Sequence, residues 1–233
     1  MRIAMWSGPR NLSTAMMYAF AAREDCAALD EPFYAPYLAL TGADHPMRDA
    51  ILAAHESDPS GVADVCSGPI PDGCLHWYQK HMPHHMVDGI PLGWGDAGFV
   101  HIHLIRHPAR VIASYLERRV SVTMADIGVA RHVEVFERFP GPVIDSFELR
   151  QDPDRILGQL CANIGLPWTP AMLRWPAGPK PFDGVWARHW YGAVHQSTGF
   201  AGPEGALPEV PFAAQKVLIE ALACYDSLRR RAL

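Results

Sequence analysis

Short apolar runs alternate with helix-forming segments along this chain, and this alternation constrains the fold more than any other feature. The runs typical of buried strands are residues 2–6, 26–29, 74–79, 99–105 and 142–149. The segments between them favour helices, since they carry helix-forming residues and capping signals. Strands that alternate with helices form a parallel sheet with helices on both faces. The pattern therefore predicts an α/β fold in three layers, α/β/α, around a parallel sheet of roughly five strands.

Turn and capping residues indicate where the other elements begin and end. Asp152 and Pro153 form a helix-start signal, with Asp as the cap and Pro in the first turn. Asn11 or Ser13 is the expected cap of the first helix. Residues rich in Ser, Asp, Pro and Gly predict a surface loop over 56–73. The remaining expected helices cover about 13–22, 35–55, 109–118, 131–139 and 210–231, and residues 176–208 are expected to be mostly irregular.

Composition narrows the class of protein. With 233 residues, of which 49% are apolar, the chain is expected to form one domain, residues 1–233, with a substantial core. A formal net charge of −5 argues against a protein that coats nucleic acid. We find no signal peptide and no apolar stretch of membrane-spanning length, and the five cysteines form no CxxC pair. We therefore expect a cytoplasmic protein with free thiols and with no nucleic-acid or membrane partner.

The loop that follows the first expected strand has the makings of an anion site. It reads Ser7-Gly8-Pro9-Arg10-Asn11-Leu12-Ser13-Thr14 and leads into a helix. Backbone N–H groups at a helix start point at bound anions, and the helix dipole favours negative charge there. Ser13 and Thr14 add hydroxyl groups, and Arg10 adds a permanent planar cation. Because ligands of parallel sheets bind beyond the carboxyl ends of the strands, residues 30–33, 80–85 and 106–114 are expected to border the same site.

This loop is not a Walker A sequence. Counted from Gly8, the places of the second glycine, the lysine and the hydroxyl residue hold Ser13, Thr14 and Ala15. The fourth expected strand ends in Arg106-His107-Pro108 instead of a magnesium-binding Asp. A magnesium-dependent NTPase is therefore disfavoured, and we expect a site that holds phosphate-like anions with protein cations and without a metal.

A second segment carries a family resemblance. Residues 104–115 place Arg106 at a strand end and Ser114 eight residues later on a helix. This order resembles the segment of sulfotransferases that binds the 3'-phosphate of their donor, 3'-phosphoadenosine 5'-phosphosulfate. The first loop is similar to the 5'-phosphosulfate loop of that family: Pro9, Arg10 and Thr14 match, and Ser13 is a near match. Asn11 and Leu12 depart from it, and Leu12 stands where glycine is usual.

The resemblance covers roughly residues 1–200 through motifs in the same order. It implies a P-loop-type fold, and it implies a metal-free, in-line transfer of a sulfuryl group to a hydroxyl or amine of a small-molecule acceptor. Residues 8–14 would hold the phosphosulfate, with Arg10 at the bridging oxygen, and Arg106 and Ser114 would hold the 3'-phosphate. Two alternatives remain open: a small-molecule kinase-like transferase of the P-loop class, and a nucleotide-binding protein of this fold without catalysis.

Two residues compete for the role of general base. Asp30-Glu31-Pro32-Phe33 resembles a segment with a catalytic glutamate in some bacterial and Golgi members. His81-Met82-Pro83 resembles the His-Leu-Pro of the cytosolic members, in which the histidine is the base. A histidine needs little adjustment of its pKa for this role, whereas a glutamate needs a raised one. Both Glu31 and His81 therefore remain candidates.

The histidines also raise the question of a metal. His101 and His103 alternate on one expected strand, and His81, His84 and His85 are close in sequence. The chain nevertheless contains no HExxH signature. We therefore expect no metal ligand among these residues.

Overall fold

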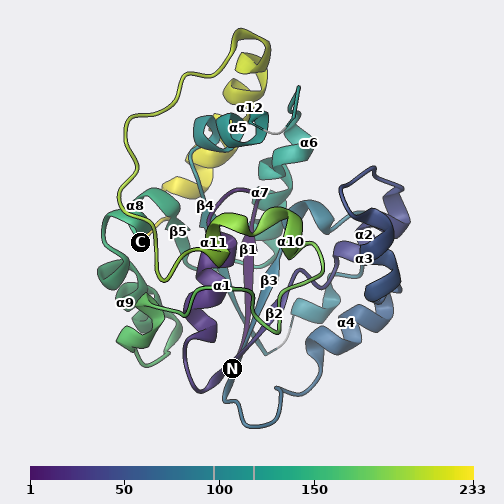
Figure 1. Cartoon of the computed structure of the whole chain (residues 1–233), viewed down its shortest axis with the longest axis vertical. Helices are drawn as coiled ribbons and strands as arrows, with labels where there is room; N and C mark the ends of the chain where they lie inside the picture. Colours follow the sequence, from purple (N-terminus) through teal and green to yellow (C-terminus); the bar gives the residue numbers. More distant parts are fainter. Residues whose placement is uncertain (97, 118) are drawn as a thin grey trace.

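The computed structural model describes residues 1–96, 98–117 and 119–233. Its strands are β1 (Arg2–Ser7), β2 (Cys26–Asp30), β3 (His76–His81), β4 (Phe99–Ile105) and β5 (Val143–Asp145). They form one parallel sheet in the order β2-β3-β1-β4-β5, with β1 in the centre (Figure 1). The predicted α/β fold with a five-stranded parallel sheet is therefore confirmed.

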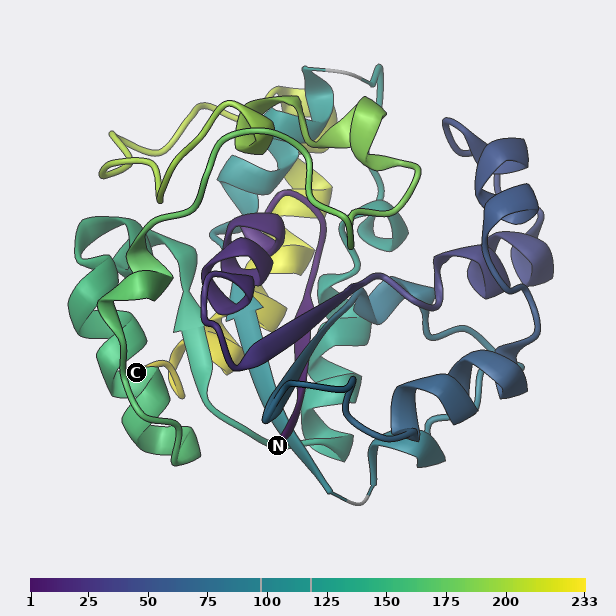
Figure 2. The same ribbon diagram turned by 60° about the horizontal axis from the view of Figure 1, so that its bottom comes forward.

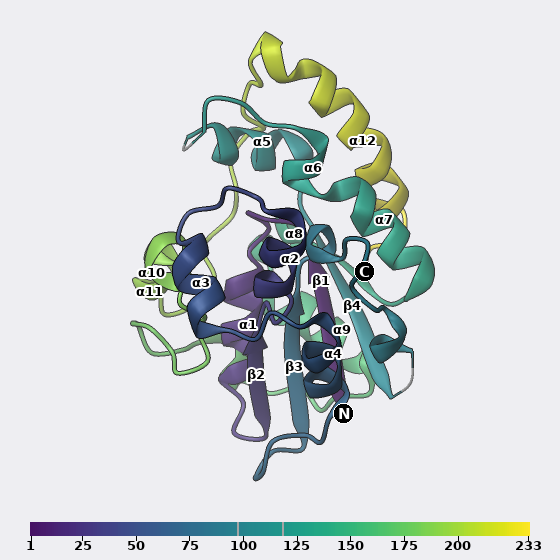
Figure 3. The same ribbon diagram turned by 90° about the vertical axis from the view of Figure 1, so that its right-hand side faces the viewer.

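Side chains alternate along β1, so successive residues pack into separate hydrophobic clusters on the two faces of the sheet. Ile3 and Met5 pack with helices α1 (Ser13–Ala21) and α9 (Pro153–Ile164). Ala4 and Trp6 pack with α4 (Pro59–Ser67) and α7 (Val129–Arg138) on the opposite face. Figure 3 shows α7 on one side of the strands and α1 on the other. Both faces of the central strand are thus buried, which explains why it is a continuous apolar run.

The remaining helices surround the carboxyl edge of the sheet and its flanks. They are α2 (Tyr34–Thr41), α3 (Arg48–Ala54), α5 (Pro108–Leu116), α6 (Met124–Ile127), α8 (Ser146–Gln151), α10 (Ala187–Trp190), α11 (Gly192–His195) and α12 (Gln215–Arg229). In Figure 2, α10 and α11 are the short light-green helices at the top of the view. Helix α12 packs against α5 and α7.

Helix α4 lies inside the segment that we predicted to be a surface loop, so that prediction is wrong. Asp58 is its N-cap, because its side chain accepts hydrogen bonds from the backbone N–H groups of Ser60 and Gly61. Pro59 occupies the first helical position. Polar and glycine residues dominate the segment, yet its buried side chains are enough to hold a helix against the sheet.

Two further bounds differ from the expectation. Strand β5 ends at Asp145, because the Asp145 side chain accepts from the Phe147 N–H and starts α8; residues 146–149 are therefore helical and not extended. The predicted helix over 35–55 is divided into α2 and α3, since Gly42 adopts a left-handed φ of 66° at the end of α2. The last residue of the expected helix 109–118, Arg118, lies outside the described residues.

Candidate functional site

The loop between β1 and α1 has an unusual backbone. Arg10 (φ 64°) and Leu12 (φ 69°) both adopt left-handed angles, which cost an L-residue roughly 1–2 kcal/mol. Leu12 occupies the N-cap position and no side chain caps the helix, so the predicted capping by Asn11 or Ser13 is wrong. Asn11 instead donates from Nδ2 to the carbonyl oxygen of Leu104 (3.3 Å) and ties the loop to β4.

The same loop presents the start of α1 to a cavity. Residues 9–15 all line this cavity. The first N–H groups of a helix have no partner within the helix, and the first turn of α1 contains no acidic residue. At Gly8 a Cβ atom would lie 2.9 Å from the carbonyl oxygen of Ile127, so the loop can approach α6 this closely only with glycine. The arrangement can bind a phosphate or sulfate group.

The cavity has a volume of about 330 Å³ and lies beyond the carboxyl ends of the strands. Its wall includes residues from each segment that the strand-end rule selected: 7–14, 30–33, 80–85 and 106–114. The four segments therefore meet at one cavity, as the strand-end rule predicted. The wall is completed by Tyr34, His45, Tyr115 and residues of the segment from Trp190 to Ala201.

A carboxylate cluster, defined as Asp30, Glu31, Lys80 and Tyr191, lies at the ends of β2 and β3. The parallel register pairs Asp30 with Lys80. Lys80 Nζ donates to Glu31 Oε1 (2.7 Å), Asp30 Oδ1 (3.1 Å) and the Tyr191 hydroxyl (2.6 Å). Tyr191 in turn donates to Asp30 Oδ2 (2.8 Å). The Lys80 and Asp30 side chains are only 1% and 0% exposed. Their pairing offsets the cost of removing both charges from water.

The charges of this cluster shift the pKa of its members. Burial raises the pKa of the Glu31 carboxyl above its ordinary value of 4.5; Lys80 opposes that shift and Asp30 adds to it. Burial alone would lower the pKa of the Lys80 amine, but the two carboxylates raise it overall. With Asp30, Glu31 and Lys80 ionised and the Tyr191 hydroxyl neutral, two carboxylates surround one ammonium and the cluster has a formal charge of −1. Glu31 is therefore a buried carboxylate with a raised affinity for a proton.

Lys80 lies within the predicted segment 80–85, but the sequence predicted no role for its side chain. Its Nζ also lies 3.3 Å from Thr14 Oγ1, so it connects the carboxylate cluster to the first loop. The signal was present, since a lysine inside a buried strand almost always has a charged partner. Asp30-Glu31 at the end of a neighbouring strand was the partner to look for.

His81 does not lie at the cavity. Side chains alternate along β3, so His81 points to the opposite face from Lys80 and packs against Trp6, Trp94 and Phe33 at ring-centroid distances of 4.9, 4.6 and 5.9 Å. Burial and the nearby His101 hold the pKa of the His81 imidazole well below 6.5. Glu31, by contrast, lines the cavity.

The two motif segments that bear the family resemblance meet in space. Arg10 Nε donates to Ser114 Oγ (2.9 Å), and Arg106 Nη1 donates to the carbonyl oxygen of Arg10 (2.6 Å). All three residues line the cavity. The strand order explains the contact, because β4 is the direct neighbour of β1.

An arginine cluster, defined as Arg106, Arg110 and Arg150 around Glu204, adjoins this contact. Arg106 forms an ion pair with Glu204 Oε1, Arg150 Nη1 lies 2.9 Å from the same oxygen, and Arg110 Nε lies 3.1 Å from Oε2. Of this cluster, the sequence predicted a binding role for Arg106 alone. The residues come from the end of β4, α5, α8 and a distant irregular segment, and no spacing in the sequence connects them.

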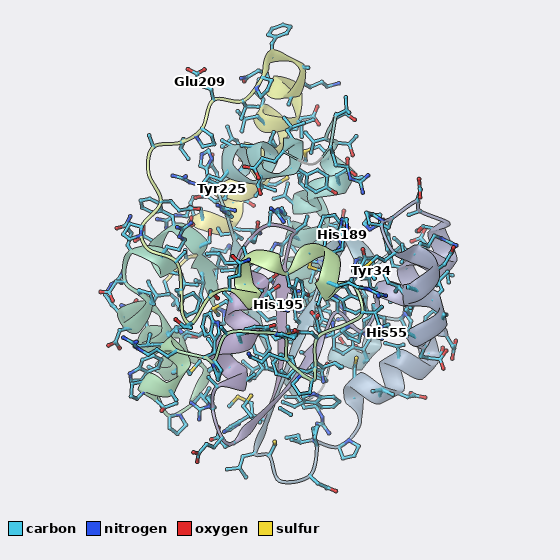
Figure 4. All side chains as sticks on the ribbon, viewed as in Figure 1. Tyr34, His55, His189, His195, Glu209 and Tyr225 are labelled. Carbon is cyan, nitrogen blue, oxygen red and sulfur yellow. The ribbon has the colours of Figure 1, made fainter. Side chains whose placement is uncertain are left out.

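Another part of the cavity wall is aromatic and neutral. It is formed by Tyr34, His45, His84, His85 and Trp190. Burial lowers the pKa of each of these histidines, that of His84 to about 4. Tyr34 Oη and His45 Nδ1 form a hydrogen bond of 2.7 Å. Figure 4 labels Tyr34 to the right of the light-green helices.

The described residues include no group of three or more His, Cys, Asp or Glu side chains arranged to hold a metal ion. His101 bonds to Gly95, and His103 pairs with His132, so these histidines lie in separate environments from His84 and His85. Within the part of the chain that the structure describes, no helix combines the length and apolar character needed to cross a membrane.

Comparison with known proteins gives matches over nearly the whole chain. A family model described as a sulfotransferase domain matches residues 1–232. Two proteins of Arabidopsis thaliana, branched-chain-amino-acid aminotransferase-like proteins 2 and 1, are 36% and 37% identical to this chain. Each match covers 97% of the chain. The match covers 41% of each plant protein, so the chain spans about two fifths of the length of these relatives.

Two solved structures share the fold. The sulfotransferase domain of the Synechococcus PCC 7002 olefin synthase is 15% identical with a TM-score of 0.52, and the match covers 98% of this chain and 94% of that one. A sulfotransferase from Alicyclobacillus acidocaldarius is 12% identical with a TM-score of 0.53, over 99% and 96% of the two chains. At such low identity the likeness concerns the arrangement of helices and strands.

Proposed function

The chain belongs to the sulfotransferase family, and on that premise we propose that it transfers a sulfuryl group from 3'-phosphoadenosine 5'-phosphosulfate to a hydroxyl or amine of a small molecule. One observation carries the proposal. A single cavity is bordered by the helix start at residues 9–15, by the buried Glu31–Lys80 pair, and by Arg106 and Ser114. The cavity can thus hold a phosphosulfate group and a second phosphate beside a proton acceptor of the protein.

The donor would be held by the first loop and the segment after β4. The N–H groups at the start of α1, with the Ser13 and Thr14 hydroxyls, offer donors to the phosphosulfate oxygens. Arg106 and Ser114 would bind the 3'-phosphate, which distinguishes this donor from ATP. Arg10 spans the two sites, because its carbonyl accepts from Arg106 and its side chain donates to Ser114.

Glu31 is the general base in this proposal, and His81 is not. Glu31 lines the cavity with a raised pKa, whereas the ring of His81 lies on the other face of the sheet. The acceptor oxygen or nitrogen forms a bond to sulfur, and the bond between sulfur and the bridging oxygen breaks. The acceptor proton passes to Glu31, and adenosine 3',5'-bisphosphate leaves. General-base catalysis of this kind contributes about 10²–10⁴-fold.

Lys80 would link the two halves of the reaction. Its ammonium contacts Glu31 on one side and Thr14 on the other. A cation at this place can stabilise the charge that develops on the leaving oxygen. As Lys80 turns toward that oxygen, its hydrogen bond to Glu31 weakens and the carboxylate becomes a stronger base.

The neutral part of the wall indicates the class of acceptor. Tyr34, His45, His84 and His85 are uncharged at neutral pH, because burial lowers the pKa of the histidines. Such a surface favours an uncharged molecule with an apolar body and a hydroxyl group. A charged acceptor would lose its hydration without gaining a partner charge there.

Binding of adenosine 3',5'-bisphosphate tests the proposal. Calorimetry should detect binding to the wild-type protein and weaker or no binding of ADP, which lacks the 3'-phosphate. Arg106→Ala should weaken bisphosphate binding at least about tenfold, since a hydrogen bond to a charged oxygen contributes about 1.5–3 kcal/mol. Arg230→Ala, at an exposed position after α12, is the matched control. Wild-type affinity in both Arg10→Ala and Arg106→Ala would refute the proposed donor site.

A further inference from the structure

A buried carboxylate lies on an otherwise exposed segment. Residues 201–209, which we name the strap, connect the region of α11 to α12 without helix or strand, on the outer left side of Figure 1. Most residues of the strap are exposed, but the Glu204 side chain is only 3% exposed. This acidic side chain therefore anchors the strap to the body of the protein.

The arginines hold the strap through Glu204 and through its backbone. Arg106, Arg110 and Arg150 all contact the Glu204 carboxylate. Arg150 Nε also donates to the carbonyl oxygen of Gly202 (2.7 Å), and Arg110 donates to that of Gly205. These contacts occupy N–H groups that could otherwise bind an anion from solution.

The charges of the arginine cluster do not balance. Three guanidinium groups surround one carboxylate, so the cluster has a formal charge of +2. A phosphate monoester carries close to two negative charges at neutral pH and offers three oxygens to arginine forks, so it would neutralise the cluster more completely than a single carboxylate does. The buried Nε of Arg106 has no hydrogen-bond partner among the described residues, although Arg106 lines the cavity.

We propose that Glu204 is a resident anion of the arginine cluster and that the 3'-phosphate of the donor displaces it. In this view Arg110 and Arg150 join Arg106 as phosphate ligands, and the strap is released when the phosphate binds. The inference rests on the proposed function, because it needs a donor with a 3'-phosphate. Displacement lowers the apparent affinity for the donor, since only the fraction of molecules with an open cluster can bind it.

The test measures two ligands on three variants and the wild type by calorimetry. Adenosine 3',5'-bisphosphate has the 3'-phosphate, and adenosine 5'-monophosphate lacks it. Glu204→Gln should bind the bisphosphate about tenfold more tightly than wild type, which is the change expected for loss of one competing charged contact. Glu204→Ala should do the same, and neither variant should alter the affinity for the monophosphate. Glu209→Gln, on the same strap and marked in Figure 4, should behave as wild type.

Hydrogen exchange of the strap supplies an independent readout. On addition of the bisphosphate to wild type, backbone exchange over 201–209 should rise, because the Glu204 anchor is released. A fall in exchange would show that the strap closes over the phosphate, and that would overturn displacement.

The outcomes separate the two proposals. If wild type binds the bisphosphate and Glu204→Gln binds it equally or more weakly, the resident-anion inference is overturned and the proposed function stands. If no form of the protein binds the bisphosphate, the proposed function fails and the inference fails with it.

Discussion

The carboxylate cluster and the arginine cluster are opposite arrangements beside one cavity. In the first, two carboxylates share one ammonium; in the second, three guanidinium groups share one carboxylate. The surplus is one negative charge in the first and two positive charges in the second. A surplus of negative charge attracts a proton, and a surplus of positive charge attracts an anion. In the proposed function the first cluster would serve the chemistry and the second would serve donor binding.

The two clusters also differ in how firmly they are built. Asp30 and Lys80 come from adjacent strands in fixed register and are 0% and 1% exposed. Arg106, Arg110 and Arg150 come from separate elements and are 16%, 10% and 19% exposed. Solvent and salt screen the second cluster more than the first. We therefore expect the first to matter for folding and catalysis, and the second for affinity.

Removal of Lys80 should have the largest effect. Lys80→Met leaves Asp30 and Glu31 buried without their cation, which typically destabilises a protein by about 3–5 kcal/mol. Urea denaturation measures this change. Lys216→Met, at a side chain that is 89% exposed, is the control and should stay within about 0.5 kcal/mol of wild type. Equal stability of the two variants would mean that the buried pairing contributes little.

Loss of the Glu31 carboxylate should affect turnover more than donor affinity. Glu31→Gln should lower kcat by about 10²–10⁴-fold with the best acceptor found in a panel, because the variant lacks the proposed general base. Calorimetry should show nearly unchanged binding of adenosine 3',5'-bisphosphate. A variant that loses binding and turnover together would assign Glu31 to the donor site.

The pH dependence of the rate is a second test of Glu31 as the proposed general base. Glu31 must be ionised to accept a proton, and its pKa is raised above 4.5 by burial. The rate should therefore fall as the pH decreases through a value above 4.5, and Glu31→Gln should lack this acidic limb. An acidic limb that persists in the variant would point to another titrating group.

Removal of Arg150 should weaken binding without unfolding the protein. Arg150→Ala should reduce affinity for adenosine 3',5'-bisphosphate about tenfold, the value for one charge-assisted contact. The deficit should shrink as salt is raised, because this side chain is partly exposed. Arg155→Ala, on α9 with a side chain that is 46% exposed, serves as the control. A deficit that does not depend on salt would contradict the proposed difference between the clusters.

The smallest effect is expected for the buried, neutral pair of His103 and His132. Burial lowers the pKa of His103 to about 3, so the folded protein binds fewer protons there than the unfolded chain. Its stability should therefore decrease as the pH falls from 6.5 toward about 3, at about 1 kcal/mol per pH unit for one such group. In His103→Gln the acid-induced loss should be smaller by that amount, as measured by urea midpoints at several pH values.

The fold was largely predictable, because alternating apolar runs and helices report directly on a parallel sheet. Helix α4 is an element that these patterns did not predict. Asp58-Pro59 is the same start signal as Asp152-Pro153, but the glycine and serine residues around it outweighed the signal. Strand β5 shows the reverse, since the apolar run continued past Asp145 while the capping side chain ended the strand.

The site divides in the same way. The sequence by itself determined the loop between the first strand and the first helix, the positions of Arg10, Glu31, Arg106 and Ser114, and the edge of the sheet at which they meet, because strand direction brings the carboxyl ends together. Only the tertiary structure decided that Lys80 and not His81 faces the cavity, since one residue of strand register reverses the side of the sheet. The tertiary structure alone also showed that Glu204 contacts three arginines distant in sequence. Such contacts depend on how separate elements pack, and no periodic pattern in the sequence reports them.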